Sequence, residues 1–368
     1  MNLAERRRVT NLDGLRGLCV LFVVFAHAVE RNSKFGEPRI AFAQELGELS
    51  LGVLFILSGF FITLILRKDQ IKNGRINFKQ FYFRRLTRIL PPVFAYIFVL
   101  AILKSTAIVT RLDTGELLTS LFFVRNLYPG SFFTGHFWTL AIDEQFYLFW
   151  PLLLTILPLN SKVLRACFVG LFAGAPFVFA YGGILPVVSS QIVASMIISM
   201  GCVLGLHECS SNMLLKRLLS LRIFVPMVIG LLGCSFLVEI EFVQSFYLRS
   251  FAAAFIVYFL AVNDLQRTLY NKFLNMRVFV FLGKISYSLY VWQQLLFGIN
   301  PPSFRSIPLR ILVCIVMAIA SYYIIERPVL RWRDRRQGKM PLKPEGSVFF
   351  PFNPSKIASM TQATSKEV

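Results

Sequence analysis

The sequence predicts an all-α polytopic membrane protein with about ten transmembrane helices. Of its 368 residues, 56% are hydrophobic and only 16% are charged, and the mean hydropathy is +0.63. Because a soluble domain carries about 25% charged residues, this composition indicates a chain embedded in a membrane. Ten apolar runs are long enough to span a bilayer, and they lie at 12–30, 49–66, 89–109, 137–157, 163–181, 186–206, 223–239, 246–262, 280–298 and 307–325.

The distribution of positive charge predicts that both termini are cytosolic. The formal net charge is +20, and 30 of the 39 Lys and Arg residues fall on the side of the N-terminus when the ten runs are threaded through a membrane. This bias follows the positive-inside rule, whereas a nucleic-acid-binding protein would carry its charge in a separate basic domain. Residues 1–337 are therefore expected to form one integral membrane domain.

Three further segments are interpreted from their composition. Residues 338–368 are rich in Pro, Gly, Ser and Thr and are expected to form a flexible cytosolic tail. The basic stretch 67–88 is expected to be a cytosolic loop that carries an amphipathic helix on the membrane surface. The first 28 residues have the outline of a cleaved signal peptide, but a retained signal-anchor explains the same pattern. The six Cys are scattered singly, so neither a metal site nor a disulfide framework is predicted.

The first apolar run carries polar residues that an ordinary membrane helix lacks. Arg16 and His27 are eleven residues apart, so on a helix they face within about 20° of each other and are separated by about 16 Å along the axis. A neutral imidazole at that depth can take a proton from an alcohol, which makes His27 a candidate general base. Alternatively, His27 is hydrogen-bonded between helices, and Asp13 forms a structural pair with Arg16.

Arginines at the start of the third run form a candidate phosphate-binding site. Arg84, Arg85 and Arg88 lie just before Pro91-Pro92. Planar guanidinium groups bind phosphate bidentately, so a phosphorylated cytosolic ligand such as coenzyme A fits this position. The same cluster also fits an ordinary positive flank that contacts lipid headgroups.

Two other runs are interrupted by polar or small residues. Ser58-Gly59 in the second run either permits close helix packing or frees backbone groups for a ligand. Asp143 and Glu144 lie in the fourth run, and at that depth at least one of them should face a cavity, an arginine or a histidine. His136, at the edge of this run, is expected to be a solvated interfacial residue. Aromatic residues of the fourth and ninth runs are the candidates for substrate binding: Trp138, Tyr147, Tyr287 and Trp292.

Six motifs in this order resemble the membrane-bound acyltransferase family called acyltransferase 3, which includes bacterial sugar O-acetyltransferases. They run from residue 12 to 328 and read LDGLRGLCVLFVVFAH, FILSGFFI, FRRLTRILPP, WTLAIDEQFYLFWP, LGKISYSLYVW and IERP. The resemblance implies about ten helices, an acyl-CoA donor reached from the cytosol and transfer to a glycan hydroxyl. It also matches the motif residues to particular positions here: Arg16 and His27, Ser58-Gly59-Phe60, Arg84, Arg85 and Arg88, and Asp143-Glu144.

The chain departs from the family pattern in two places. Many members have a histidine after the ninth-helix tryptophan, where this chain has Gln293. The chain is also expected to lack the soluble esterase-like extension of some members, which removes the simplest case for peptidoglycan O-acetylation by a two-domain relay.

The hypothesis from the sequence is an O-acyltransferase of the bacterial inner membrane that moves an acyl group, most simply acetyl, from acetyl-CoA to a cell-surface or lipid-linked saccharide. Its expected catalytic residues are His27, Asp13, Arg16, Glu144 and Asp143, its donor-binding residues are Arg84, Arg85, Arg88, Ser58 and Gly59, and no metal is expected. Three alternatives stay open: a proton-coupled transporter built on the same intramembrane charges, a lipid-binding scaffold without activity, and an acyltransferase with a non-sugar acceptor.

Overall fold

The computed structural model describes residues 3–31, 37–110, 112–156, 186–208, 242–262, 269–299 and 306–337. Every regular element in these ranges is a helix, which confirms the all-α class. The expected spans 163–181 and 223–239 and the tail 338–368 lie outside the described residues. The total of ten spans and the cytosolic position of the termini therefore stay predictions.

Within the described residues, four helical stretches are long and apolar enough to cross a membrane, which supports an integral membrane protein. They are Thr10–Glu30 in α1 (Leu3–Glu30), Arg39–Asn73 in α2 (Glu37–Asn73), α3 (Phe78–Ser105), and Ile307–Arg336, which joins α14 (Ile307–Ser321), the π-helical η2 (Tyr322–Glu326) and α15 (Arg327–Arg336). Shorter apolar stretches lie in α8 (Pro186–Glu208) and α11 (Phe242–Val262).

The remaining elements lie between these helices. They are α4 (Thr114–Leu121), the 3-10 helix η1 (Arg125–Leu127), α5 (Phe132–Gly135), α6 (Phe137–Ile156), α12 (Leu269–Leu274) and α13 (Arg277–Ile299). Between α3 and α6, therefore, the chain forms three short helices in succession.

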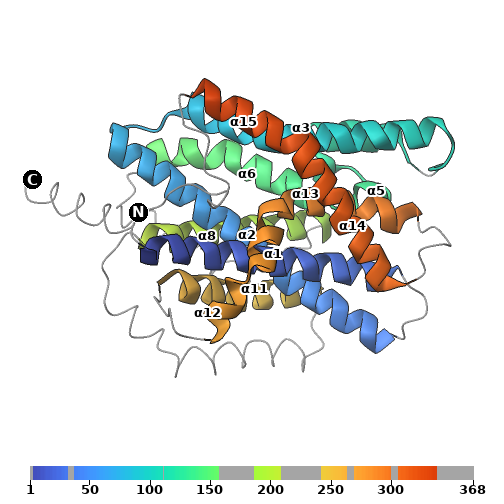
Figure 1. The fold of residues 1–368 in the computed structure, drawn as a ribbon, viewed down its shortest axis with the longest axis horizontal. Coiled ribbons are helices and arrows are strands. Elements are labelled where there is room, and N and C mark those ends of the chain that lie inside the picture. The colour runs from blue at the N-terminus through green and yellow to red at the C-terminus, as the bar shows by residue number, and fades with distance from the viewer. Residues whose placement is uncertain are drawn as a thin grey trace, which may run out of the picture.

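Helix α1 lies within the bundle, with α3 and α15 along one edge of the molecule and α11 and α12 on the opposite side (Figure 1). It packs against α2 and α13, although α13 is far away in the sequence. Glycines make this contact close: a Cβ at Gly283 would collide with the backbone carbonyl of Asp13, and one at Gly17 would collide with that of Phe279. Small residues in membrane helices let backbones approach in this way.

The prediction of a surface loop at 67–88 is wrong. Helix α2 continues to Asn73 and α3 begins at Phe78, so a turn of only a few residues joins them. Asn77 caps α3, because its side chain accepts a hydrogen bond from the backbone N–H of Gln80 at 3.0 Å. The side chains of Phe78 and Phe81 pack against a buried cluster that includes Trp150. The amphipathic pattern therefore reflects helix packing within the bundle.

Candidate active site

An ion pair between α3 and α6 forms the centre of one polar region. Arg85 donates two hydrogen bonds to Glu144, from Nε to Oε2 at 2.9 Å and from Nη2 to Oε1 at 2.7 Å. The same guanidinium lies 3.1 Å from the ring centroid of Tyr147. A bidentate pair stacked on an aromatic ring fixes the guanidinium plane. The acid of the fourth run thus faces an arginine, as its depth predicted.

Other charged residues surround this pair. Arg88 lies within electrostatic range of Arg16, Asp13 and Glu326. Glu326 is 3% exposed and accepts a hydrogen bond from the Ser288 hydroxyl. We refer to these charged residues together as the charged cluster, which comprises Asp13, Arg16, Arg85, Arg88, Asp143, Glu144 and Glu326.

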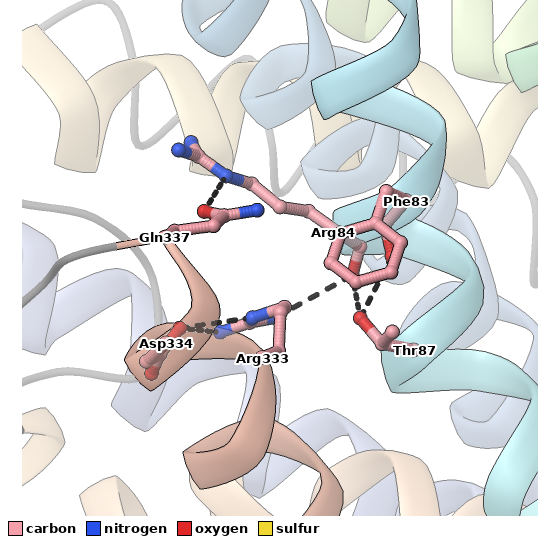
Figure 2. Close-up of polar contacts among 6 residues, drawn as sticks. All are labelled: Phe83, Arg84, Thr87, Arg333, Asp334 and Gln337. Carbon is pink, nitrogen blue, oxygen red and sulfur yellow. Dashed lines mark hydrogen bonds and ion pairs between the residues drawn. The ribbon is translucent and has the colours of Figure 1, made fainter.

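The three arginines of the third run face three different neighbours. Whereas Arg85 binds Glu144 and Arg88 faces α1 and η2, Arg84 donates a hydrogen bond from Nε to the side-chain oxygen of Gln337 at 2.8 Å. Figure 2 shows this contact beside Arg333, which bonds Asp334. The sequence predicted that the three arginines form one phosphate site. In the structure Arg85 and Arg88 belong to the charged cluster, whereas Arg84 is directed to Gln337. A role of these arginines in phosphate binding stays a prediction.

Ser58 and Gly59 have different surroundings, because Ser58 contacts a charged residue and Gly59 contacts the backbone of a neighbouring helix. The Ser58 hydroxyl donates to Asp143 Oδ2 at 3.5 Å, which places Ser58 next to the charged cluster. The other oxygen of this carboxylate, Asp143 Oδ1, is buried and has no hydrogen-bond partner among the described residues. A Cβ at Gly59 would instead collide with the backbone carbonyl of Ile198, so Gly59 lies in the close contact of α2 with α8.

His27 lies toward the other end of α1, and its hydrogen bonds fix its tautomer. Its Nδ1 is 3.0 Å from the backbone carbonyl of Val23. Because a carbonyl only accepts, Nδ1 carries the proton, and Nε2 of the neutral ring carries the lone pair. The side-chain amide nitrogen of Gln294 lies 3.5 Å from this Nε2. The Gln293 amide also faces the ring, outside hydrogen-bond geometry.

The same Gln294 also binds a second histidine, His136. The backbone N–H of His136 donates to Gln294 Oε1 at 2.9 Å, and His136 Nδ1 lies 2.7 Å from the same oxygen. His136 is only 3% exposed, so the expectation of a solvated interfacial residue is wrong. We call His27, Gln294 and His136 the histidine pair with its bridging amide. Figure 1 places α5, which precedes His136, at the far end of the bundle from α15.

The four aromatic candidates for substrate binding do not form one site. Tyr147 stacks on Arg85, and Tyr287 donates its hydroxyl to the Ile89 carbonyl at 3.2 Å. Trp292 is 8% exposed and belongs to a buried cluster between α3 and α13, while Trp138 packs against a different cluster built on α2 and α8. Their contact with a substrate stays a prediction.

The short helices before α6 support the histidine end through Glu116. This residue completes a capping box with Asp113, and it accepts hydrogen bonds at 2.7 Å from Ser131 and Thr134. Burial by itself would raise the pKa of Glu116, but the hydrogen bonds from Thr134 and Ser131 outweigh it and hold the pKa below its usual value. From α6, Gln145 donates to the Phe123 carbonyl at 2.9 Å, which ties the segment to the bundle.

The site residues predicted from the sequence did not include His136, Gln294 or Glu326. A histidine, an amide and a carboxylate in or beside apolar helices indicate a candidate site in the sequence, because such groups must find partners inside the protein. Glu326 also ends a π-helical segment, a local irregularity that is frequent at functional sites.

Comparison with known proteins assigns the chain to a family. A family model described as an acyltransferase domain matches residues 9–327. The chain belongs to this acyltransferase family. The match begins within α1 and ends at the first residue of α15, so it includes both the charged cluster and the histidine pair.

Longer bacterial proteins are similar to this chain. The O-acetyltransferase OatA of Staphylococcus aureus is 27% identical over 366 residues, covering 88% of this chain and 57% of its own length. YrhL of Bacillus subtilis is 27% identical over 364 residues, with 88% and 55% covered. The peptidoglycan O-acetyltransferase OatA of Listeria monocytogenes is 32% identical over 185 residues, or 45% of this chain and 28% of the relative. The chain spans little more than half the length of the first two. No solved structure matches it.

Proposed function

We propose that this chain is a membrane O-acetyltransferase that moves an acetyl group from cytosolic acetyl-CoA to a hydroxyl of a cell-wall saccharide. The family and the O-acetyltransferase relatives support the reaction class. The observation that carries the proposal is the tautomer of His27, because its Nδ1 hydrogen bond to Val23 leaves the lone pair on Nε2, where a base needs it.

In this proposal His27 acts on the acceptor hydroxyl. The hydroxyl gives its proton to His27 Nε2 as its oxygen attacks the thioester carbonyl, the carbon–sulfur bond breaks, and the proton passes from His27 to the departing thiolate. A covalent variant, in which Nε2 first takes the acetyl group and then passes it on, uses the same lone pair.

The charged cluster and Arg84 would serve the donor. Arg16 in the cluster and His27 are about 16 Å apart along α1, so a pantetheine arm could extend along this helix from one region to the other. Arg84, which lies beside Arg333 at the end of the bundle, is our first candidate for the nucleotide phosphates, since Arg85 already binds Glu144. We place the enzyme in the cytoplasmic membrane, with the acceptor on the far face.

The first experiment measures transfer from radiolabelled acetyl-CoA in membranes that contain the wild-type chain or His27→Ala. We expect a loss of about 10²–10⁴-fold, because a positioned general base contributes that much. His207→Ala, at the end of α8, is the matched control and should transfer at the wild-type rate. Undiminished transfer by His27→Ala would exclude His27 as the base. Solute uptake driven by a pH gradient and indifferent to acetyl-CoA would support the transporter alternative.

A second experiment separates donor binding from catalysis. Arg84→Lys keeps the charge but loses the planar fork, so KM for acetyl-CoA should rise several-fold while kcat stays near wild type. Arg331→Lys, at an exposed position of α15, is the control. Equal KM values in all three proteins would remove Arg84 from the phosphate site and leave the reaction class untouched.

A further inference from the structure

His136 has a buried nitrogen that the proposed reaction does not use. Its Nε2 is inaccessible to solvent and has no hydrogen-bond partner among the described residues. Buried polar atoms in native proteins are almost always hydrogen-bonded, because an unsatisfied one keeps the full cost of its desolvation. The atom therefore indicates a missing partner.

The bridging amide determines what kind of partner fits. The backbone N–H of His136 can only donate, so the Gln294 atom that faces it is the oxygen, and His136 Nδ1 must also donate to this oxygen. In the neutral ring Nε2 is then an acceptor. The missing partner is a hydrogen-bond donor, such as a hydroxyl group.

Among the described residues, the tyrosine hydroxyls beside the His136 ring bond elsewhere, and that of Tyr290 contacts the Thr139 hydroxyl and the His136 carbonyl. The rings of Tyr96, Phe137 and Tyr290 lie 5.2, 4.6 and 5.7 Å away between centroids, and the first meets His136 edge-on. The Tyr96 hydroxyl donates elsewhere, to the Phe133 carbonyl at 2.7 Å. The Val291 carbonyl also faces the His136 ring, outside hydrogen-bond geometry, and a carbonyl cannot donate.

Gln294 couples this acceptor to the proposed base. Its oxygen accepts both hydrogen bonds of His136, so its amide hydrogens point away, and the amide nitrogen lies 3.5 Å from His27 Nε2. One amide thus contacts two imidazoles, since its oxygen accepts from His136 and its nitrogen faces Nε2 of His27. A ligand with several neighbouring hydroxyls, as in a saccharide, can bond His136 Nε2 with one hydroxyl and replace the Gln294 amide at His27 Nε2 with another.

We propose that His136 Nε2 accepts a hydrogen bond from a hydroxyl of the acceptor saccharide and thereby holds the reacting hydroxyl next to His27. His136 is in this view an acceptor-binding residue, and Gln294 is a positioning residue for both rings. The inference rests on the proposed function for the identity of the acceptor, but saccharide binding is measurable without acetyl transfer.

Two substitutions make opposite predictions for binding and structural roles. The amide of His136→Asn can replace Nδ1 as donor to Gln294 but has no atom at the position of Nε2. His136→Gln can place an amide oxygen near the position of Nε2 and loses the Nδ1 contact. Tyr96→Phe, which keeps the ring beside His136 and removes a buried hydroxyl, is the packing control.

The experiment uses the full chain in lipid nanodiscs and, as probe, soluble saccharide fragments released from peptidoglycan by a muramidase. For His136→Asn we expect KM for the fragments to rise about 5–10-fold, the value of one neutral hydrogen bond, with KM for acetyl-CoA unchanged. His136→Gln should recover part of this loss, and Tyr96→Phe should match wild type. A wild-type KM in His136→Asn, or a larger defect in His136→Gln than in His136→Asn, would overturn the inference.

Equilibrium binding of the same fragments, without acetyl-CoA, separates the two proposals. Wild type should bind them about 5–10-fold more tightly than His136→Asn. If wild type binds the fragments more tightly than His136→Asn but transfers no label from acetyl-CoA, the proposed donor reaction fails and the role of His136 stands. If wild type transfers the label and His136→Asn binds the fragments equally well, the role of His136 fails alone.

Discussion

The charged cluster and the histidine pair lie at different ends of α1 and satisfy their polar groups in different ways. In the charged cluster, Arg85 and Glu144 bind each other through two hydrogen bonds, and their side chains are only 24% and 15% exposed. At the histidine end, neutral groups share one amide, and His136 Nε2 has no partner among the described residues. The comparison shows that the charges of Arg85 and Glu144 are compensated by each other, because a buried charge without a partner is costly, whereas the neutral His136 Nε2 has no such compensation within the described residues.

The largest expected effect tests this compensation directly. Arg85→Ala leaves the Glu144 carboxylate without its partner, so the free energy of unfolding should fall by about 3–5 kcal/mol. Thermal unfolding in detergent measures the change. The double variant Arg85→Leu/Glu144→Leu should be more stable than Arg85→Ala, and Arg331→Ala, at an exposed position, should be within about 0.5 kcal/mol of wild type. A double variant no more stable than the single one would contradict a compensated pair.

The next effect concerns the helix contact that holds both regions in place. Gly283→Ala should lower the free energy of unfolding by about 1–3 kcal/mol, because the new Cβ meets the backbone carbonyl of Asp13, which cannot move aside alone. In Gly52→Ala the nearest atom is the Ser250 hydroxyl at 3.0 Å, the end of a side chain, so the loss should be smaller. Equal stability of the two variants would show that α1 and α13 can separate without cost.

A smaller effect is expected at the histidine end of the molecule, where lowering the pH should weaken local stability. Hydrogen bonds hold the pKa of Glu116 below its usual value, so its stabilising contribution is present above that value and is lost as the pH falls through the lowered pKa. Hydrogen exchange, corrected for intrinsic rates, should show residues 112–136 losing protection below about pH 4. Glu116→Gln should be less protected at neutral pH and less sensitive to acid. An identical acid response in both proteins would exclude Glu116 as the cause.

The smallest expected effect on stability belongs to the histidine whose loss should most reduce activity. His27→Gln retains a polar group of similar size, and we expect its unfolding free energy to stay within about 0.5 kcal/mol of wild type. Thermal unfolding of the membrane-purified protein checks this value beside the transfer assay. A variant that loses stability along with activity would make His27 a structural residue and remove the contrast between the two regions.

The sequence by itself determined the membrane class, the helical fold and the alignment of Arg16 with His27. These follow from composition and from the period of a single helix, which needs no knowledge of neighbours. It also indicated that an acid of the fourth run would face a cavity, an arginine or a histidine, since an unpaired carboxylate in an apolar helix is costly.

Only the tertiary structure decided which partners meet. In the structure Arg84, Arg85 and Arg88 face three different neighbours, and His27 contacts Gln294, a residue 267 positions away. Helical periodicity gives the face on which a residue lies but not the helix that covers this face. That choice depends on close contacts such as the one between Gly283 and the Asp13 carbonyl, where backbone shape from two distant segments must match.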